Sequence, residues 1–167
     1  LFFLFIATIS FGQIIHKRKL SMLGSPFEMT VVAKDTVQGN QYIDLGIAEV
    51  KRIEYLISDW IPSTQISKVN QNAGIKPIKV DKEVYDLVER AIKVSQITSG
   101  AFDISYASMD KIWKFDGSMK QMPTEEAIKK SISKIGYKNI ILDPKGQTIF
   151  LRKEGMKLGL GGIGQGY

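Results

Sequence analysis

The stretch that decides the fold is Asp81–Ser105, which reads DKEVYDLVERAIKVSQITSGAFDIS. Its apolar side chains recur at helical spacing, at Val84, Leu87, Val88, Ala91 and Val94. This spacing predicts a helix with one buried face. Asp81 is a suitable N-cap for that helix, and Gly100 is a suitable residue to end it.

After this helix, Ala101, Phe102 and Asp103 place a carboxylate between apolar neighbours, with no basic residue within several positions. Such a carboxylate is turned to solvent, is hydrogen-bonded as a cap, or accepts hydrogen bonds from a bound ring or ribose. In the last case Phe102 and Ala101 would shape the cleft. All three interpretations remain open from these residues alone.

The other segments mix helix and strand signals. They predict a strand at Phe27–Ala33, a long helix at Val37–Ser58, a helix opened by Pro123–Glu126, and a hairpin of Ile140–Leu142 with Thr148–Leu151. Ile128, Ile132 and Ile135 are expected to form the buried face of the helix after Pro123. Because these elements follow no regular βαβ order, the pattern predicts an α+β fold.

The composition excludes several classes of function. The net charge is +6, with 23 basic and 17 acidic residues among 167. The basic residues are scattered and form no recognised nucleic-acid motif, so we expect a solvated surface and no nucleic-acid partner. The chain holds no cysteine, which excludes thiol nucleophiles, cysteine metal ligands and a lipidated cysteine within it. Its only histidine, His16, has no partner nearby in sequence for a Ser-His-Asp triad.

Residues 1–12, LFFLFIATISFG, are uncharged and rich in Phe, Leu and Ile. The run is shorter than the roughly 20 apolar residues that a membrane-spanning helix needs. It fits the apolar core of a secretory signal peptide, with Ser10, Phe11 and Gly12 as the small-x-small cleavage pattern. We therefore expect export, and the alternative is a buried N-terminal strand.

Two further features are candidates for chemistry. Gly159–Gly164 fits the pattern G-x-G-x-x-G, whose glycines either let the backbone approach a phosphate or form a tight turn. Ser58–Gly74 is a polar, loop-like passage in which Trp60 either stacks on a planar ligand or anchors the loop. Three polar residues of this passage are suited to cap the next turn or to bind phosphate, namely Ser63, Ser67 and Asn70.

Five motifs occur in a characteristic order: MLGSPFEMTV, EVKRIEYLISDWIPSTQISKVNQNAG, TSGAFDIS, IGYKNIIL and GMKLGLGGIGQGY. In order and spacing the chain resembles the ApbE family, the FAD:protein FMN transferases, from about Met22 to Tyr167. The resemblance implies an α+β fold with a mixed sheet and packed helices. Family members are commonly much longer, so we expect residues 20–167 to be the N-terminal portion of the domain, incomplete at the C-terminus.

The resemblance also implies an activity, a magnesium-dependent transfer of FMN from FAD to a Thr or Ser hydroxyl of a target protein, with release of AMP. It implies an exported protein, periplasmic or associated with the outer face of the inner membrane. Targets of the family include subunits of membrane redox pumps. Since the family's later metal ligands have no counterpart before Tyr167, we expect the longer protein to transfer FMN and the 167-residue chain not to do so.

By position, the resemblance implies ligand contacts at Leu23, Trp60, Ala101, Phe102, Asp103 and Gln165, and a metal contact at Gly162. Gly162 has no side chain and could offer only its carbonyl oxygen. The family commonly has Met in place of Leu23, Lys or Glu in place of Gln165, and Asp in place of Gly159. No residue is assigned as catalytic. We expect the Ala101–Asp103 corner and the glycine run to fold towards each other around one dinucleotide.

Three other functions remain open beside the transferase. The first is an exported flavin- or nucleotide-binding protein without transferase activity, which the glycine run and Asp103 would serve equally well. The second is a Rossmann oxidoreductase, although it would require a βαβ repeat before Gly159. The third is an exported structural or interaction module with a basic face.

Overall fold

The computed structural model describes residues 12–22, 24–114, 116–164 and 166–167. The chain divides into two compact units, and the boundary falls between Ile53 and Glu54, inside helix α1 (Thr36–Ile57). Helices, short 3-10 turns and antiparallel strands occur in mixed order, which confirms the predicted α+β class.

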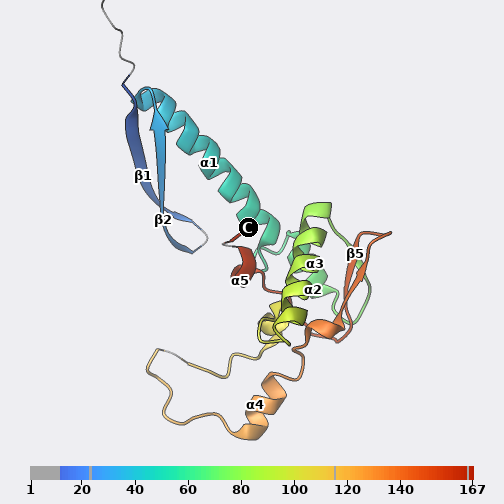
Figure 1. Ribbon diagram of the computed structural model, residues 1–167. Helices are drawn as coiled ribbons and strands as arrows, with labels where there is room; N and C mark the ends of the chain where they lie inside the picture. The colour runs from blue at the N-terminus through green and yellow to red at the C-terminus, as the bar shows by residue number, and fades with distance from the viewer. Residues whose placement is uncertain (1–11, 23, 115, 165) are drawn as a thin grey trace, which may run out of the picture. The chain divides into compact units, whose positions relative to one another are not determined.

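The first unit consists of an antiparallel hairpin beside most of α1 (Figure 1). Strands β1 (Ile14–Met22) and β2 (Ser25–Ala33) pair along their whole length. Two glycines let the helix approach the hairpin closely. A Cβ at Gly39 would lie only 2.8 Å from His16 Cβ, and a Cβ at Gly46 would lie 3.1 Å from Met29 Sδ.

Polar contacts tie this hairpin to α1. The half-buried ring of His16 is hydrogen-bonded through Nε2 to Asn40 Oδ1 at 3.0 Å, so His16 is not simply solvated. Arg18 donates to the same Asn40 oxygen at 2.7 Å and forms an ion pair with Asp44. The faces that meet are therefore partly polar, around a core that includes Ile43.

The second unit is built around helix α3 (Lys82–Ile97), helix α2 (Gln65–Gln71) and a small sheet (Figure 1). The sheet has the order β3 (Ile78–Lys79), β5 (Thr148–Leu151), β4 (Ile140–Asp143), and all its pairs are antiparallel. The predicted helical stripe is confirmed in four of its five residues, because Val84, Leu87, Val88 and Ala91 are buried, whereas Val94 is half-buried. The predicted hairpin is confirmed as β4 and β5.

Short elements complete the second unit. They are the 3-10 turns η1 (Ile104–Ser108) and η2 (Tyr137–Asn139), and the helices α4 (Glu125–Ser131) and α5 (Gly161–Gly164). Thr124 caps α4 by accepting a hydrogen bond from the Ala127 N–H at 3.2 Å. The isoleucine face predicted for α4 is wrong in part. The helix ends at Ser131, which is buried, whereas Ile132 is 44% exposed.

Two further predictions need correction. The Ser58–Gly74 passage is not all loop, because it contains α2, which Thr64 caps by accepting from the Ser67 N–H at 3.1 Å. Asp81 does precede α3, but its side chain makes no capping bond there. Instead, Asp81 Oδ2 accepts a hydrogen bond from Gln65 Nε2 at 2.5 Å, which links the starts of the two helices.

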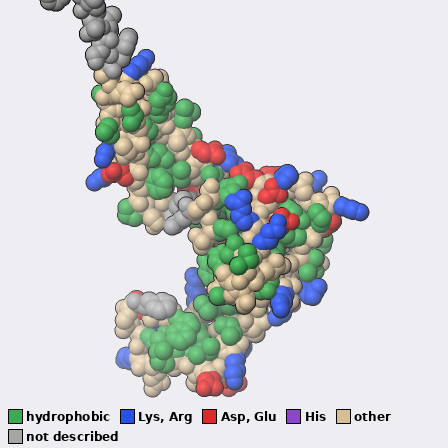
Figure 2. Space-filling model, in the orientation of Figure 1, with side chains coloured by type: hydrophobic (Ala, Val, Ile, Leu, Met, Phe, Trp, Pro, Cys, Tyr) green, Lys and Arg blue, Asp and Glu red, His purple; other side chains and the backbone are tan. Residues whose placement is uncertain are grey.

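The surface agrees with the expected scatter of charge. On the face shown in Figure 2, Lys and Arg side chains lie in several separate places among acidic and uncharged groups. Within the described ranges, no helix combines the length and the apolar character that crossing a membrane requires. The proposed signal peptide at 1–12 falls almost wholly on residues 1–11, which lie outside the described part of the chain.

Candidate functional site

The segment Met156–Leu160, which belongs to no helix or strand, connects the parts of the candidate site. Met156, Leu158 and Leu160 have no exposed surface, whereas Lys157 points outward and is exposed. One side of this segment therefore lies in the core while the other presents a cation at the surface.

Two side chains hold the backbone of this segment, and each one both donates and accepts. Asn70 donates from Nδ2 to the Leu158 carbonyl oxygen at 3.0 Å and accepts through Oδ1 from the Leu158 N–H at 2.7 Å. The Ser108 hydroxyl donates to the Lys157 carbonyl oxygen at 3.0 Å and accepts from the Lys157 N–H at 2.8 Å. These bonds fix the position from which the glycine run starts.

The Ala101–Asp103 corner and the glycine run lie against each other. The Gly159 N–H donates to the Ile104 carbonyl oxygen at 2.9 Å. A Cβ at Gly162 would lie 3.4 Å from Phe102 Cε2, and a Cβ at Gly159 would lie 3.2 Å from the Tyr106 hydroxyl. The expected closeness of the two segments is therefore confirmed. A dinucleotide held between them stays a prediction.

Both oxygens of the half-buried Asp103 carboxylate are hydrogen-bonded inside the protein. Oδ1 accepts from the Ser105 N–H at 2.8 Å and from the Ser105 hydroxyl at 2.6 Å. Oδ2 accepts from the Tyr137 N–H at 2.7 Å, and Ser105 Oγ accepts from the Gly136 N–H at 2.8 Å. Asp103 is thus the cap of η1 and ties it to the first residue of η2. A ligand contact for Asp103 stays a prediction.

We expect the variant Asp103→Asn to lose about 1–2 kcal/mol of unfolding free energy, because its amide nitrogen would replace Oδ2 and meet the Tyr137 N–H, another donor. Urea unfolding followed by tryptophan fluorescence measures the loss. Both tryptophans, Trp60 and Trp113, belong to the second unit and therefore report on the same part of the chain as Asp103.

Asp116 provides a matched control for this variant. It makes the same local turn, because Asp116 Oδ1 accepts from the Ser118 N–H at 2.9 Å and from the Ser118 hydroxyl at 2.6 Å. These bonds lower the pKa of Asp116, the side-chain bond from Ser118 more than the backbone one. Asp116→Asn should cost much less than Asp103→Asn. Equal losses would show that the bond to Tyr137 contributes little.

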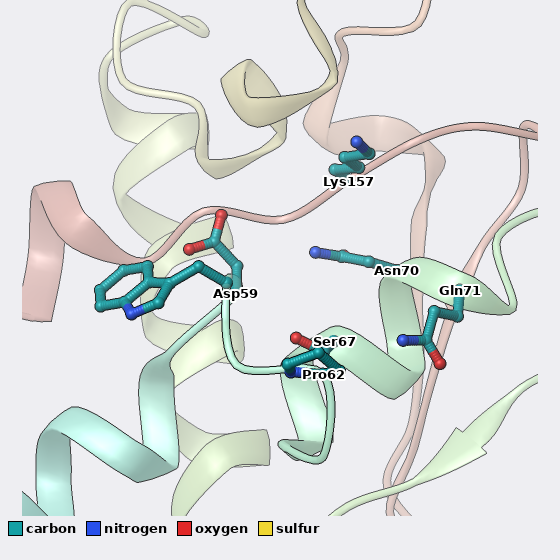
Figure 3. Close-up of a pocket in the computed structure, with 7 residues that line it drawn as sticks. Asp59, Pro62, Ser67, Asn70, Gln71 and Lys157 are labelled. Carbon is teal, nitrogen blue, oxygen red and sulfur yellow. The ribbon is translucent and has the colours of Figure 1, made fainter.

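A cleft of about 260 Å³ lies beside Lys157, and Trp60 forms part of its lining. The complete lining consists of Asp59, Trp60, Pro62, Ser67, Asn70, Gln71 and Lys157. Figure 3 shows Asp59, Ser67, Asn70 and Lys157 around one common space. Trp60 is 63% exposed, so most of its indole is accessible from the solvent, and a ligand contact at this residue stays a prediction.

Of the other residues predicted to contact a ligand or metal, some lie beside the glycine run and others lie outside the described residues. Ala101 is exposed and Phe102 is half-buried at the corner beside the glycine run. Leu23 and Gln165 lie outside the described residues. Gly162 is exposed at the second position of α5, where it can offer a backbone carbonyl oxygen but no side chain.

A magnesium ion binds preferentially to carboxylate oxygens and water. Within the described ranges, no three or more His, Cys, Asp or Glu side chains are grouped so that they could hold a metal ion. The described residues therefore do not by themselves fit a magnesium site built from carboxylates.

Sequence reasoning missed two charged residues of the cleft, Asp59 and Lys157. A signal for Lys157 was present in the alternation Met156-Lys157-Leu158, which turns the lysine away from the core at the start of the glycine run. Asp59 precedes Trp60 directly and had no comparable signal. It lines the cleft because the chain leaves α1 at Ile57 and turns towards α2.

Comparisons with known proteins agree on one family. The sequence pattern described as the ApbE family matches residues 23–167. An FAD:protein FMN transferase of Klebsiella pneumoniae is 26% identical over 146 residues, which cover 87% of this chain and 45% of that protein. The crystal structure of the ApbE protein of Thermotoga maritima aligns with a TM-score of 0.78 at 27% identity, covering 92% of this chain and 50% of that one.

A flavin transferase ApbE of Vibrio cholerae aligns with a TM-score of 0.74 at 17% identity and shows the same fold. The chain spans less than half of the Klebsiella protein and half of the two solved chains. The family pattern nevertheless covers nearly all of the present sequence, from residue 23 to its end. The chain therefore belongs to the ApbE family.

Proposed function

We propose that the protein is an FAD:protein FMN transferase. The observation that carries the proposal is the bond from the Gly159 N–H to the Ile104 carbonyl oxygen. This bond joins the glycine run to the Ala101–Asp103 corner. Lys157, two residues before Gly159, lines the same cleft as Trp60. The names of the relatives, which include FAD:protein FMN transferases, support the same activity.

In the proposed reaction, a Thr or Ser hydroxyl oxygen of the target protein attacks the phosphorus on the FMN side of the FAD pyrophosphate. A phosphoester bond forms between that oxygen and the phosphorus, and the bond from the phosphorus to the bridging oxygen breaks. AMP leaves with the bridging oxygen, and the hydroxyl proton is released to a base or to solvent. The products are the flavinylated protein and AMP.

The chain's own residues would bind and orient the substrate. We assign ring stacking to Trp60, a neighbouring cation to Lys157, and close backbone approach to the run after Leu158. Phe102 and Ala101 would border the nucleotide, and Asp103 would hold their corner in place through its internal bonds. Positioning of this kind supplies much of the rate in phosphoryl-type transfers.

Magnesium belongs to the proposal as the ion that neutralises charge on the pyrophosphate when it is bound. Gly162 would offer its carbonyl oxygen, and no group of three or more His, Cys, Asp or Glu side chains among the described residues would complete the site.

We further propose an exported protein, with a signal peptide at 1–12 and the N-terminal portion of the transferase domain at 20–167. The apolar, uncharged run at the start of the sequence supports this assignment. The location would be periplasmic or on the outer face of the inner membrane. The partner would be a flavin-accepting protein, such as a subunit of a membrane redox pump.

The test of the function is covalent flavin transfer. The 167-residue chain, and a version extended by whatever reading frame follows Tyr167, are incubated with FAD, Mg²⁺ and candidate acceptor proteins. We expect the extended version to produce flavin fluorescence that survives denaturing electrophoresis, together with AMP, and the 167-residue chain to produce neither. Binding of FAD without transfer by both versions would favour the alternative, a flavin-binding protein.

We expect Trp60→Ala to weaken FAD binding by about tenfold, because stacking of one base on an aromatic side chain contributes about 1–3 kcal/mol. Calorimetry measures the affinity, and thermal unfolding should change little because Trp60 is 63% exposed. Tyr42→Ala is the control, since Tyr42 is also an exposed aromatic residue (46%) but does not line the cleft. Equal FAD affinity in both variants would show that FAD does not bind in this cleft.

A further inference from the structure

A further cavity lies in the second unit, between helix α3 and the turn that joins β4 to β5. Its volume is about 330 Å³, at the lower end of the range of about 300–1,000 Å³ that is usual for small-molecule sites. It shares no lining residue with the cleft of Trp60, so the proposed transfer of FMN does not use it. The lining consists of Lys82, Tyr85, Asp86 and Glu89 on α3, and of Pro144 and Gln147 in the turn.

Tyr85 is the buried polar residue of this lining. It is only 6% exposed. In the part of the chain that the structure describes, its hydroxyl nevertheless forms no hydrogen bond. Buried polar side chains are paired in the large majority of cases, so this exception calls for an explanation. Because Tyr85 lines the cavity, a group bound there would supply the partner that the hydroxyl lacks.

Carboxylates act on this hydroxyl from both sides of the cavity. Burial raises the pKa of Tyr85, and the negative charges of Glu89, Asp143 and Asp86 raise it further. Glu89 and Asp86 lie on α3, whereas Asp143 is the last residue of β4. The hydroxyl therefore stays protonated in a negative field between the two elements, and such a field attracts a cation.

The nearby lysines do not fully cancel this field. Lys82 forms an ion pair with Asp86 at 2.5 Å, and Lys93 forms one with Glu89 at 3.2 Å. Both pairs join exposed side chains four positions apart on a helix, a kind of pair that contributes little to stability. A bound cation can therefore take the place of Lys93 at Glu89. Asp143 accepts two backbone N–H groups of its own turn, at 3.0 Å and 3.1 Å, and forms no ion pair within the described ranges.

The arrangement suits an organic cation better than a metal ion. Among the described residues, the carboxylates around Tyr85 are not grouped closely enough to hold a metal. A guanidinium is larger and planar, and it pairs with a carboxylate through two parallel N–H bonds. Its flat faces also pack on aromatic and apolar surfaces, which Tyr85 and Pro144 provide here.

We propose that this cavity binds a guanidinium group, with Glu89 accepting two of its N–H groups and the Tyr85 hydroxyl oxygen accepting a third. The group belongs either to an arginine side chain of a partner protein or to a small free guanidine. The site goes beyond the proposed transferase function. An arginine seated in it would attach a partner to the second unit through residues that take no part in the cleft of Trp60.

The experiment is calorimetric titration of the protein with three probes. They are agmatine, an arginine tripeptide blocked at both ends, and the same peptide with citrulline, which has the shape of arginine but no charge. We expect the citrulline peptide to bind at least about tenfold more weakly than the arginine peptide, because it lacks the charge that pairs with Glu89. Tighter binding of the arginine peptide than of agmatine would identify a partner's side chain as the source, and the reverse order a free guanidine. No binding of either cation at millimolar concentration would overturn the proposal, as would equal affinity for the arginine and citrulline peptides.

Tyr85→Phe tests the hydroxyl, because it keeps the buried ring. We expect this variant to bind the arginine peptide about two- to tenfold more weakly, as the loss of one hydrogen bond predicts. Its thermal midpoint should not change, since the hydroxyl has no partner to lose among the described residues. Tyr42→Phe is the control, because Tyr42 lies outside the cavity and is 46% exposed. A lower midpoint with unchanged peptide binding in Tyr85→Phe would assign the hydroxyl a structural role and refute the proposal.

Glu89→Gln tests the charge and does not alter a buried residue. We expect it to weaken binding of the arginine peptide about tenfold or more, because hydrogen bonds to a charged group are the stronger ones. Glu125→Gln is the matched control, since Glu125 also pairs with a lysine four positions later, Lys129 at 3.9 Å, but does not line the cavity. Equal affinity in these two variants would contradict the proposal. None of these titrations contains FAD, so their outcome is independent of whether the protein transfers FMN.

Discussion

Replacing Gly74 with alanine should lower the unfolding free energy of the second unit by about 3 kcal/mol, for two separable reasons. Gly74 has a φ of +77°, a conformation that costs an L-residue roughly 1–2 kcal/mol. In addition, a Cβ at this position would lie 2.8 Å from both the Cα and the backbone nitrogen of Glu154. Because those atoms are backbone, they cannot move aside without shifting the turn that leads to Met156.

The position of Gly74 is fixed by a further bond, which leaves little room for adjustment. Its N–H donates to the Leu151 carbonyl oxygen at 2.7 Å and so ties the end of the α2 region to β5. A shift at Gly74 would therefore be transmitted to the sheet and to the segment that carries Lys157. We expect FAD binding by the variant to weaken together with stability.

Gly117→Ala separates the two causes. Gly117 has a similar φ of +79°, but a Cβ there would meet nothing within 4 Å. This variant should cost only the conformational part, about 1 kcal/mol. Urea unfolding of both variants, followed by tryptophan fluorescence, measures the difference. If Gly74→Ala costs no more than Gly117→Ala, the contact with Glu154 is unimportant.

The parts of the fold that the sequence predicts are those whose apolar pattern is long and regular. Helix α3 repeats its apolar residues over its whole length, and β4 and β5 flank an evident turn at Asp143–Gly146. In α3 the apolar residues recur at the period of a helix, and in β4 and β5 the buried residues alternate as in a strand. The local sequence pattern therefore agrees with the tertiary packing.

The elements that were missed lack such a pattern for identifiable reasons. The inward side of β1 carries His16 and Arg18, which meet Asn40 and Asp44 on α1, so polar pairs take the place of an apolar alternation. Helix α2 has only seven residues, too few to show a helical period in a usual window. β3 has two residues and exists because β5 pairs with it.

The sequence predicts which segments form the candidate site, but it does not predict the individual contacts between their residues. The closeness of Asp103 and the glycine run follows from the family's motifs, but the cap to Tyr137 is a contact between residues 34 positions apart. No local pattern contains such a pairing. The same holds for Ser67, whose buried hydroxyl has no hydrogen-bond partner among the residues that the structure describes.

The other large effect is expected for Asn70→Ala, which should cost about 2–4 kcal/mol and sharply weaken FAD binding. Asn70 satisfies both backbone groups of Leu158, at 3.0 Å and 2.7 Å, across 88 positions of sequence. Alanine would leave a donor and an acceptor of a buried segment unpaired. Since Leu158 stands between Lys157 and Gly159, the cleft and the glycine run would lose their common support.

Two further variants test whether the bonds from Asn70 to Leu158 cause these losses of stability and FAD binding. Asn72→Ala removes an asparagine just after the same helix whose Nδ2 donates only locally, to the Lys68 carbonyl oxygen at 2.8 Å, so it should cost far less. Asn70→Asp keeps the acceptor for the Leu158 N–H but sets an oxygen against the Leu158 carbonyl, so it should remain destabilised and bind FAD weakly. Asn70→Asp could still behave like wild type. In that case the bond from the Leu158 N–H to Oδ1 would be sufficient, and the bond from Nδ2 to the Leu158 carbonyl oxygen would not be needed to position the site.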